Sequence, residues 1–424
     1  MHSAAKVLKF PLSGIARDID YRKAYIPEEE VQFATPFALN VRGSDTFHRR
    51  NRGGSRPGLS VTTVPTVADT HNPHKQYETT GLLEAPVAAT TFYRARTVAA
   101  VGTMWYMSAM GDSTNWTFNG DSGDPSRAFA GNVENATIKG DTITALMSIR
   151  DQWLFIATAH SLWCLTGDPI GGTLKCVSEH IGCISRDAWC FDGEALWVLS
   201  NQGLYRIGIG EMPLRMSHHI PEEFRGTSTA LLAYDPEDNA IHIFSIRGSG
   251  VSEVVSDWFY DIENKAFWRQ SFRAEHRPTE ICTYMKDGVN VLAFKGGDNA
   301  WRVFDDEEGT DSGEMFTSRV AIGPVRCSAR DDMDGMVAEI EATLASGSEN
   351  SLVSVYTAHS PEEAVRIAYN DQIPVSTFVV KSGWNNVCRP RQRGAWAVFV
   401  LSSTGRWGFE SMTTIAKQFG RLRR

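Results

Sequence analysis

Residues 153–220 read WLFIATAHSLWCLTGDPIGGTLKCVSEHIGCISRDAWCFDGEALWVLSNQGLYRIGIGEMPLRMSHHI, and this stretch decides the expected fold. It contains one unit twice: an apolar run, a short polar turn, and an aromatic-X-aliphatic return. The first copy runs from Trp153–Thr158 to Trp163–Leu165, and the second from Leu196–Ser200 to Tyr205–Ile207. Short runs of bulky and β-branched residues bounded by turn residues predict β-hairpins. Two hairpins of the same design indicate a repeated array.

The same unit recurs elsewhere in the chain. Two further copies begin at Ala240 and Val291, and each returns through a turn to an aromatic-rich run. Another copy is Met104–Met107, which we expect to return as Trp116–Phe118. Two weaker copies follow, in which we expect Val337–Leu344 to return as Leu352–Tyr356 and Trp396–Leu401 as Trp407.

The spacing of the clearer copies predicts the fold class. Their starts are roughly 45 residues apart, which is the length of one four-stranded propeller blade. We therefore expect an all-β protein, a β-propeller of about six or seven blades, preceded by an irregular N-terminal arm. The last two units resemble the others least, and a β-sandwich-like extension is the alternative for them.

The expected domain organisation follows from these units. Residues 1–56 would form the N-terminal arm and loops, which make contacts between subunits. Residues 57–330 would form the propeller blades. Residues 331–424 would form the final blades, or a β-sandwich-like closure, and end in a basic tail.

Composition limits the functional classes. The 424 residues are 42% hydrophobic and carry a formal charge of −8, which argues against a protein that grips nucleic acid over its whole surface. The seven cysteines form no C-x-x-C pair, so free thiols in a reducing cytoplasm are expected. No signal peptide and no run of 18 apolar residues is found, which predicts a soluble protein without a membrane span.

No catalytic motif stands out. The sequence lacks a P-loop, an H-E-x-x-H motif and a G-x-S-x-G elbow, so we predict no enzyme, no cofactor, and no catalytic or metal-binding residue. His71 and His74 have H-x-x-H spacing, but Pro73 lies between them and disfavours a helix. A propeller glycosidase would need paired acids. Asp151, Asp192 and Asp287 stand in equivalent turns of several units, which is typical of structural turn residues.

Two local patterns lie outside the repeated units. The acidic run from Asp305 to Asp311 lacks the ordered ligand spacing of an EF-hand, so a solvated turn is expected there. Ser360 followed by Pro361, Glu362 and Glu363 predicts a short capped helix that decorates a loop.

Several short segments together resemble a known family. They are Leu165–Pro169, Ile181–Gly182, Gly203–Arg206, Ser217, Ile220, Ser55–Leu59 and Phe419–Arg421. They resemble the propeller-type tail proteins of short-tailed bacteriophages, which are called tail nozzle, tail tube or packaged-DNA stabilisation proteins. The chain departs from that family in its size, since it contains no obvious inserted tip or gate domain.

The resemblance implies a structural virion protein, assembled in the host bacterial cytoplasm. Six copies would form a ring of the head–tail connector complex, below the portal and adaptor proteins and next to tail fibres or spikes. Such a ring would extend the channel through which double-stranded DNA is retained and then ejected. The assembly contacts expected on this basis are Arg49, Arg50, Arg52, Arg56, Arg421, Arg423 and Arg424. A β-propeller glycoside hydrolase or lyase and a cellular propeller interaction module are the alternatives.

Overall fold

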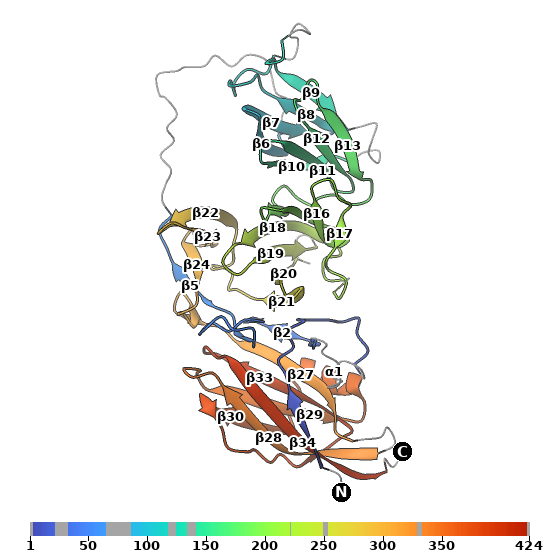
Figure 1. Cartoon of the computed structure of the whole chain (residues 1–424), viewed down its shortest axis with the longest axis vertical. Helices are drawn as coiled ribbons and strands as arrows, with labels where there is room; N and C mark the ends of the chain where they lie inside the picture. Colours follow the sequence, from blue (N-terminus) through green and yellow to red (C-terminus); the bar gives the residue numbers. More distant parts are fainter. Residues whose placement is uncertain are drawn as a thin grey trace. The chain divides into compact units, whose positions relative to one another are not determined.

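The computed structural model of the chain is almost entirely β (Figure 1). It describes residues 3–21, 33–64, 86–117, 124–133, 141–220, 222–248, 253–328 and 333–421. Within these ranges the secondary structure is 34 strands and one α-helix, so the prediction of an all-β fold is confirmed. The chain divides into two compact units. The first comprises Met1–Val64, Asp235–Ile241 and Asp257–Arg424, and the second comprises Pro65–Tyr234 and His242–Ser256.

The second unit contains three antiparallel sheets of four strands, and in each sheet every strand pairs with the next one along the chain. This is the strand number and order of a propeller blade. The first sheet is β6 (Ala89–Tyr93), β7 (Arg96–Val101), β8 (Met104–Met107) and β9 (Phe129–Asn132). The second is β10 (Ile143–Ile149), β11 (Trp153–Thr158), β12 (Leu162–Thr166) and β13 (Thr173–Ser178). The third is β14 (Trp189–Phe191), β15 (Ala195–Ser200), β16 (Gly203–Gly208) and β17 (Leu214–Arg215).

The two hairpins expected between residues 153 and 220 are the central strand pairs of two of these sheets. Trp153 pairs with Thr166 across β11 and β12, and Ser200 pairs with Gly203 across β15 and β16. All six residues of β15 are buried, which explains its unbroken apolar run. Buried side chains of the first two sheets, among them Met107 and Ile156, share one core.

The predicted return of Met104–Met107 as Trp116–Phe118 is wrong. β8 pairs instead with β7 on one side and with β9 on the other. Trp116 lies in a loop, and Phe118 lies outside the described residues. The polar run that follows Met107 suggested a hairpin turn, but it is part of a longer connection between β8 and β9.

Two more sheets contain consecutive strands that neighbour one another. One has the order β18 (Thr227–Asp235), β19 (Ala240–Arg247), β20 (Val254–Asp261) and β21 (Ala266–Gln270), and its residues are divided between the two units. The other lies in the first unit and has the order β22 (Glu280–Lys286), β23 (Val289–Lys295), β24 (Trp301–Asp305), β5 (Gly58–Val61), β25 (Thr310–Asp311) and β26 (Glu314–Met315).

The sheet that begins at β22 takes its fourth strand from the N-terminal segment. β5 runs antiparallel to β24, with Val303 opposite Ser60 and Asp305 opposite Gly58. A strand near the start of the chain therefore completes a sheet whose other strands lie more than two hundred residues later. Within the described residues, four sheets are therefore four-stranded meanders, and this one begins with the meander β22, β23 and β24.

The units predicted at Val337 and Trp396 are not blades. Their strands are divided between two sheets of the first unit (orange to red in Figure 1). One sheet consists of β1 (Ser3–Leu8), β34 (Phe409–Arg421), β28 (Met333–Leu344), β31 (Gly383–Trp384) and β32 (Gln392–Arg393). The other consists of β2 (Ala38–Leu39), β27 (Ser318–Arg326), β33 (Trp396–Ser403), β29 (Ser351–Ala358) and β30 (Ser376–Val380).

These two sheets form the β-sandwich that was the alternative for the last units. β28 and β29 are consecutive strands, yet they belong to different sheets, and so do β33 and β34. The predicted hairpins between them are therefore wrong. Seven of the eight residues of β33 are buried, because its sheet is covered on both faces.

The helix α1 (Pro361–Tyr369) covers one face of the sandwich. Ser360 caps it by accepting a hydrogen bond from the backbone N–H of Glu363 at 3.2 Å, as the sequence predicts. Ala364, Val365 and Ala368 are buried against β33, β29 and β27. The helix is therefore part of the core and does not merely decorate a loop.

The N-terminal segment is mostly irregular, as expected, but it is packed into the first unit. Its strands are short: β1, β2, β3 (Val41–Arg42) and β4 (Gly54–Ser55), the last two of which form a small sheet. β1 pairs along its length with β34, so strands from both ends of the chain are neighbours. This pairing explains why the compact units differ from the predicted division into residues 1–56, 57–330 and 331–424.

In the part of the chain that the structure describes, no helix combines the length and the apolar character needed to cross a membrane.

Candidate functional site

Four of the seven arginines predicted as assembly contacts lie in the loop between β3 and β4 or just after it. Arg49 is exposed and Arg52 is largely buried, while Arg56 is completely buried. Arg50 is exposed and has no ion-pair partner among the described residues. The side chain of Arg421, together with Arg423 and Arg424, lies outside the described residues.

Arg56 forms a buried ion pair within the chain. Its two terminal nitrogens donate to Asp311 at 2.9 and 2.6 Å, and its Nε donates to Asn40 Oδ1 at 3.2 Å. The guanidinium lies over the rings of Phe272 and Phe316, at 4.7 and 3.8 Å from the ring centroids. Burial lowers the pKa of Arg56, and Asp311 opposes that shift. No part of the guanidinium remains for contact with another subunit, so Arg56 is a structural residue.

Arg49 connects two acidic loops. Its Nη2 lies 2.7 Å from Glu237 Oε1, and its Nε lies 2.7 Å from Asp306 Oδ2. Asp306 and Asp311 belong to the acidic run that was expected to be a solvated turn. The expectation holds for Glu307 and Glu308, which are exposed, but not for Asp306 and Asp311, which are the partners of Arg49 and Arg56. The sequence signal that could have predicted these ion pairs is the presence of a basic run at 49–56 and an acidic run at 305–311 in the same chain.

Asp45 organises the loop that carries the arginines. Its Oδ1 accepts hydrogen bonds from the backbone N–H groups of Phe47 and His48, both at 2.9 Å. Its Oδ2 accepts from the backbone N–H of Arg50 at 3.0 Å and from Arg52 Nε at 2.8 Å. Burial alone would raise the pKa of the Asp45 carboxyl, but these hydrogen bonds outweigh it and hold the pKa below its ordinary value.

The substitution Asp45→Asn is expected to lower the free energy of unfolding by about 2 kcal/mol at neutral pH, because an amide nitrogen would face the two donors on Arg50 and Arg52. A carboxyl whose pKa is lowered by folding stabilises the fold above its unfolded pKa of about 4, and that contribution is lost as the pH falls through the folded pKa. The difference between the variant and the natural chain should therefore shrink below about pH 4.

Chemical denaturation followed by tryptophan fluorescence at neutral and acidic pH measures this difference. Asp287→Asn is the matched control, since Asp287 is exposed and its φ of 52° suits asparagine. A difference that is the same at both pH values would contradict the assigned role of the Asp45 carboxylate.

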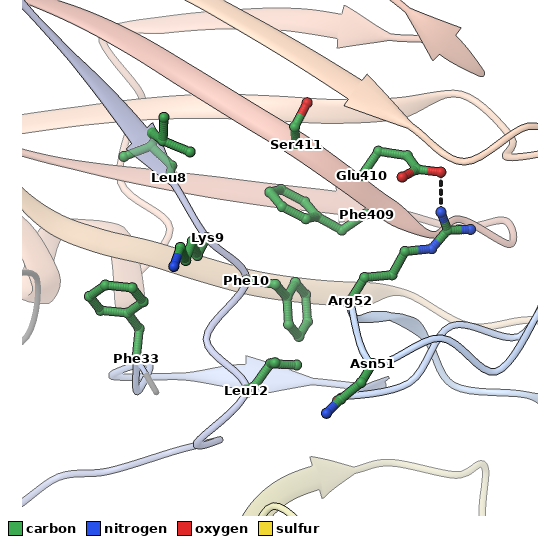
Figure 2. Close-up of a pocket in the computed structure, with 11 residues that line it drawn as sticks. Leu8, Lys9, Phe10, Leu12, Phe33, Asn51, Arg52, Phe409, Glu410 and Ser411 are labelled. Atoms are coloured by element: carbon green, nitrogen blue, oxygen red, sulfur yellow. Dashed lines mark hydrogen bonds and ion pairs between the residues drawn. The ribbon is translucent and has the colours of Figure 1, made fainter. Parts of the chain in front are cut away.

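A pocket of about 360 Å³ lies beside Arg52 (Figure 2). Its apolar lining comes from the end of β1 and the segment after it, from Phe33 and from the start of β34. The ring of Phe10 lies 5.8 Å from that of Phe409. At the rim, Arg52 Nη1 forms an ion pair with Glu410, as the dashed line in Figure 2 shows. The shape and lining suit an apolar group that approaches past charged residues.

A second pocket, of about 380 Å³, lies in the second unit next to β6 and β14. Its one carboxylate is Asp187, which pairs with Arg186 at 2.9 Å. The carboxylate of the first pocket, Glu410, is also paired with an arginine. Neither pocket therefore contains the two carboxyl groups that a glycoside hydrolase uses. No group of three or more His, Cys, Asp or Glu side chains that could hold a metal occurs in the described ranges.

The aspartates expected to be turn residues are confirmed in that role. Asp192 Oδ1 accepts from the backbone N–H groups of Glu194 and Ala195, and its Oδ2 accepts from Trp197 Nε1, all at 2.7 Å. Asp151 accepts from the backbone N–H of Arg94. Asp151 and Asp287 have φ values of 55° and 52°, which asparagine and aspartate tolerate in turns.

All seven cysteines are free thiols, as expected. Cys183, Cys190 and Cys327 are buried, and Cys176 is exposed. Burial raises the pKa of Cys183 and of Cys327 to about 12, so neither is a thiolate at neutral pH. His71 and His74 lie outside the described residues.

Residues that carry the family resemblance occupy constrained positions. Gly203 has a φ of +131°, and a Cβ there would lie 2.0 Å from Ser217 Oγ. Ser217 Oγ accepts from the backbone N–H of Leu204 at 3.2 Å, so two of the resembling segments touch each other. A Cβ at Gly58 would lie 2.2 Å from the carbonyl oxygen of Thr310. Local packing therefore requires glycine at both positions.

Comparisons with known proteins identify no family. No family model matches the chain, and no curated protein does. One matching solved structure is the extracellular domain of a protein described as a hybrid two-component system from B. thetaiotaomicron. It is 9% identical to this chain, with a TM-score of 0.32. The match covers 63% of this chain and only 32% of that structure. Another is the S. cerevisiae complex of dbp5 with nup159, gle1, IP6 and ADP, with 11% identity, a TM-score of 0.34, and coverage of 76% of this chain and 92% of that one. At such scores neither likeness carries an argument.

Proposed function

We propose that this chain is a structural protein of a bacteriophage tail, and that copies of it form a ring that extends the DNA-exit channel. The observation that carries the proposal is the structural role of the residues that resemble the tail proteins. Arg56 and Gly58 of the Arg-Pro-Gly segment are fully buried and tightly packed, and Gly203 touches Ser217. Buried, tightly packed residues can be substituted less freely than exposed ones. A resemblance at such residues is therefore better evidence of a family relationship than a resemblance at exposed residues.

The fold supports the same proposal. Consecutive four-stranded antiparallel sheets are the units of a propeller, and the family that the sequence resembles is of the propeller type. The sandwich that joins β1 to the last strands and the sheet that contains β22 belong to the same compact unit. A compact body of several sheets suits a component of a stable wall.

The charge of the chain supports a role in conducting DNA. A formal charge of −8 does not favour stable binding of phosphates. A wall of this kind would let a genome slide past without holding it. In this proposal the portal and adaptor proteins lie above the ring, and fibres or spikes attach to it.

The location of the chain in a particle tests the proposal. In negative-stain micrographs of bacteriophage particles that contain this chain, an antibody against the purified chain should label the tails. The labelled part of the tail should have six-fold symmetry. Labelling of heads by an antibody against the capsid protein serves as the control. Particles whose tails remain unlabelled while the chain is found in cell extract would overturn the proposal.

The glycoside hydrolase alternative makes a different prediction about the same protein, since it requires a pair of carboxylates in one pocket. In both pockets described above the single carboxylate is paired with arginine. These observations favour the structural role.

A further inference from the structure

One face of the sandwich carries a concentration of positive charge. We define the basic face as Arg389, Arg391, Arg393 and Lys417. Arg391 and Arg393 are exposed, and the side chain of Arg389 is 58% exposed. Arg389 Nε lies 3.1 Å from Glu339 Oε1, which partly balances that charge, and Arg393 also takes part in an interaction.

Strand pairing brings Arg389, Arg393 and Lys417 together, and Arg391 directly precedes β32. Arg393 of β32 is opposite Met336 of β28, and Met336 is opposite Lys417 of β34. Residues directly opposite each other in an antiparallel sheet project on the same face. The bridge between Cys388 and Ile340 places Arg389 beside Glu339 on that face. Arg393 and Lys417 therefore belong to two strands of one sheet, and Arg389 and Arg391 to the segment that leads into β32.

The first unit also carries the opposite charge. We define the acidic loops as residues 235–238, with the sequence DPED, and residues 305–308, with the sequence DDEE. Their seven carboxylates meet three arginines: Arg42 is paired with Asp238, Arg49 joins the two loops, and Arg406 donates to the carbonyl oxygen of Glu307 at 2.9 Å. Asp235 is buried and has an interaction partner, but the other six carboxylates still outnumber these three arginines, so the acidic loops keep a surplus of negative charge.

Three carboxylates of the acidic loops are exposed to solvent. Glu307 and Glu308 are exposed, and the side chain of Glu237 is 57% exposed. Burial and the neighbouring carboxylates raise the pKa values of Glu237 and Asp306, although Arg49 opposes both shifts. An additional cation at this place would relieve the repulsion between carboxylates.

We propose that the basic face of one copy of this chain docks onto the acidic loops of a second copy, so that the copies associate head to tail. The inference rests on the proposed function, which requires a ring of identical subunits. Two different surfaces of one chain form a heterologous interface, and such an interface generates a ring when its rotation closes. The occupant of the basic face is a second copy because the complementary surface is present on the same chain. A polyanion such as DNA would meet an overall charge of −8.

Charge reversal in the purified full-length chain tests this docking. The natural chain should self-associate at low ionic strength in sedimentation velocity experiments, and added salt should weaken the association. The variant Arg391→Glu/Arg393→Glu and the variant Glu307→Lys/Glu308→Lys should each weaken it at least about tenfold, because like charges would face each other. An equimolar mixture of the two variants should associate again, since each retains one natural surface and their reversed surfaces attract each other.

The control variant is Arg186→Glu/Arg225→Glu, which reverses two exposed arginines in the second unit. It should associate like the natural chain. Unchanged denaturation midpoints show that the variants are folded. A monomeric natural chain at low salt, or reversal variants that associate as it does, would overturn the proposal.

The main alternative is that the basic face binds DNA, and binding of a fluorescent DNA duplex of about 20 base pairs tests this alternative. Duplex binding that is lost in Arg391→Glu/Arg393→Glu, with self-association unchanged, would assign the basic face to DNA and sink the docking proposal. These outcomes are independent of the location of the chain in a particle. If the chain self-associates through these charges but is absent from tails, only the proposed function is overturned. If the chain is found in tails but the charge-reversal variants associate normally, only the docking proposal is overturned.

Discussion

Replacing Arg56 by methionine is expected to lower the free energy of unfolding by about 3–5 kcal/mol, because it leaves Asp311 charged, buried and unpaired. Asp311 is 3% exposed, and its carboxylate accepts two hydrogen bonds from Arg56. The guanidinium also fills the space between Phe272 and Phe316, which methionine occupies with fewer contacts. Denaturant unfolding of the purified chain measures the loss.

The double variant Arg56→Met/Asp311→Leu distinguishes a buried charge from lost packing. It should be less destabilised than Arg56→Met, since no uncompensated charge remains in the core. Arg49→Met is the matched control, because the side chains of Arg49 and Glu237 are 43% and 57% exposed, so water screens their ion pair. It should cost no more than about 1 kcal/mol. A double variant as unstable as the single one would refute the assigned cause.

Truncation of Trp407 to alanine should have an effect of similar size, about 3–5 kcal/mol, through the cavity that it creates. Trp407 is completely buried, its ring lies 6.3 Å from that of Phe10, and its Nε1 donates to Ser318 Oγ at 2.7 Å. Its backbone also exchanges hydrogen bonds with Ser55. The residue therefore joins the N-terminal segment to the last strands.

Near-ultraviolet circular dichroism and the denaturation midpoint report the effect of the Trp407 substitution. Trp384→Ala is the control, because that side chain is 64% exposed, and the change should stay within about 0.5 kcal/mol. Trp407→Phe should fall between the two, since it keeps most of the apolar volume and loses the hydrogen bond to Ser318. Equal midpoints for the two alanine variants would show that Trp407 does not hold the segment in place.

The local elements of this protein could be predicted from its sequence. The apolar runs at Trp153–Thr158 and Leu196–Ser200 are strands, and the helix begins after Ser360 as its cap predicts. Asp192 occupies a turn, as its spacing indicates. These features depend on a few neighbouring residues, since strand and helix periodicity and turn chemistry act over short distances.

The partners of the strands were decided by the tertiary structure. β28 and β29 have the pattern of a hairpin, yet they belong to different sheets, because the pairing β28·β34 joins residues separated by most of the C-terminal segment. The alternation of buried and exposed residues fixes which face of a strand is buried, but it does not identify the strand beside it. The predicted blades at Val337 and Trp396 failed for this reason.

In the candidate site, too, the sequence predicts local properties but not which residues meet, as the basic run at 49–56 and the acidic run at 305–311 show. Their sequences establish two opposite charges, and each run taken alone resembles a solvated loop. Only the fold brings Arg56 and Asp311, 255 residues apart, into one buried ion pair. Burial then changes the energy of the pair, because a charge removed from water must be matched by a partner at hydrogen-bonding distance. The sequence by itself determined the strands, turns and charges of this protein, and the tertiary structure decided which of them meet.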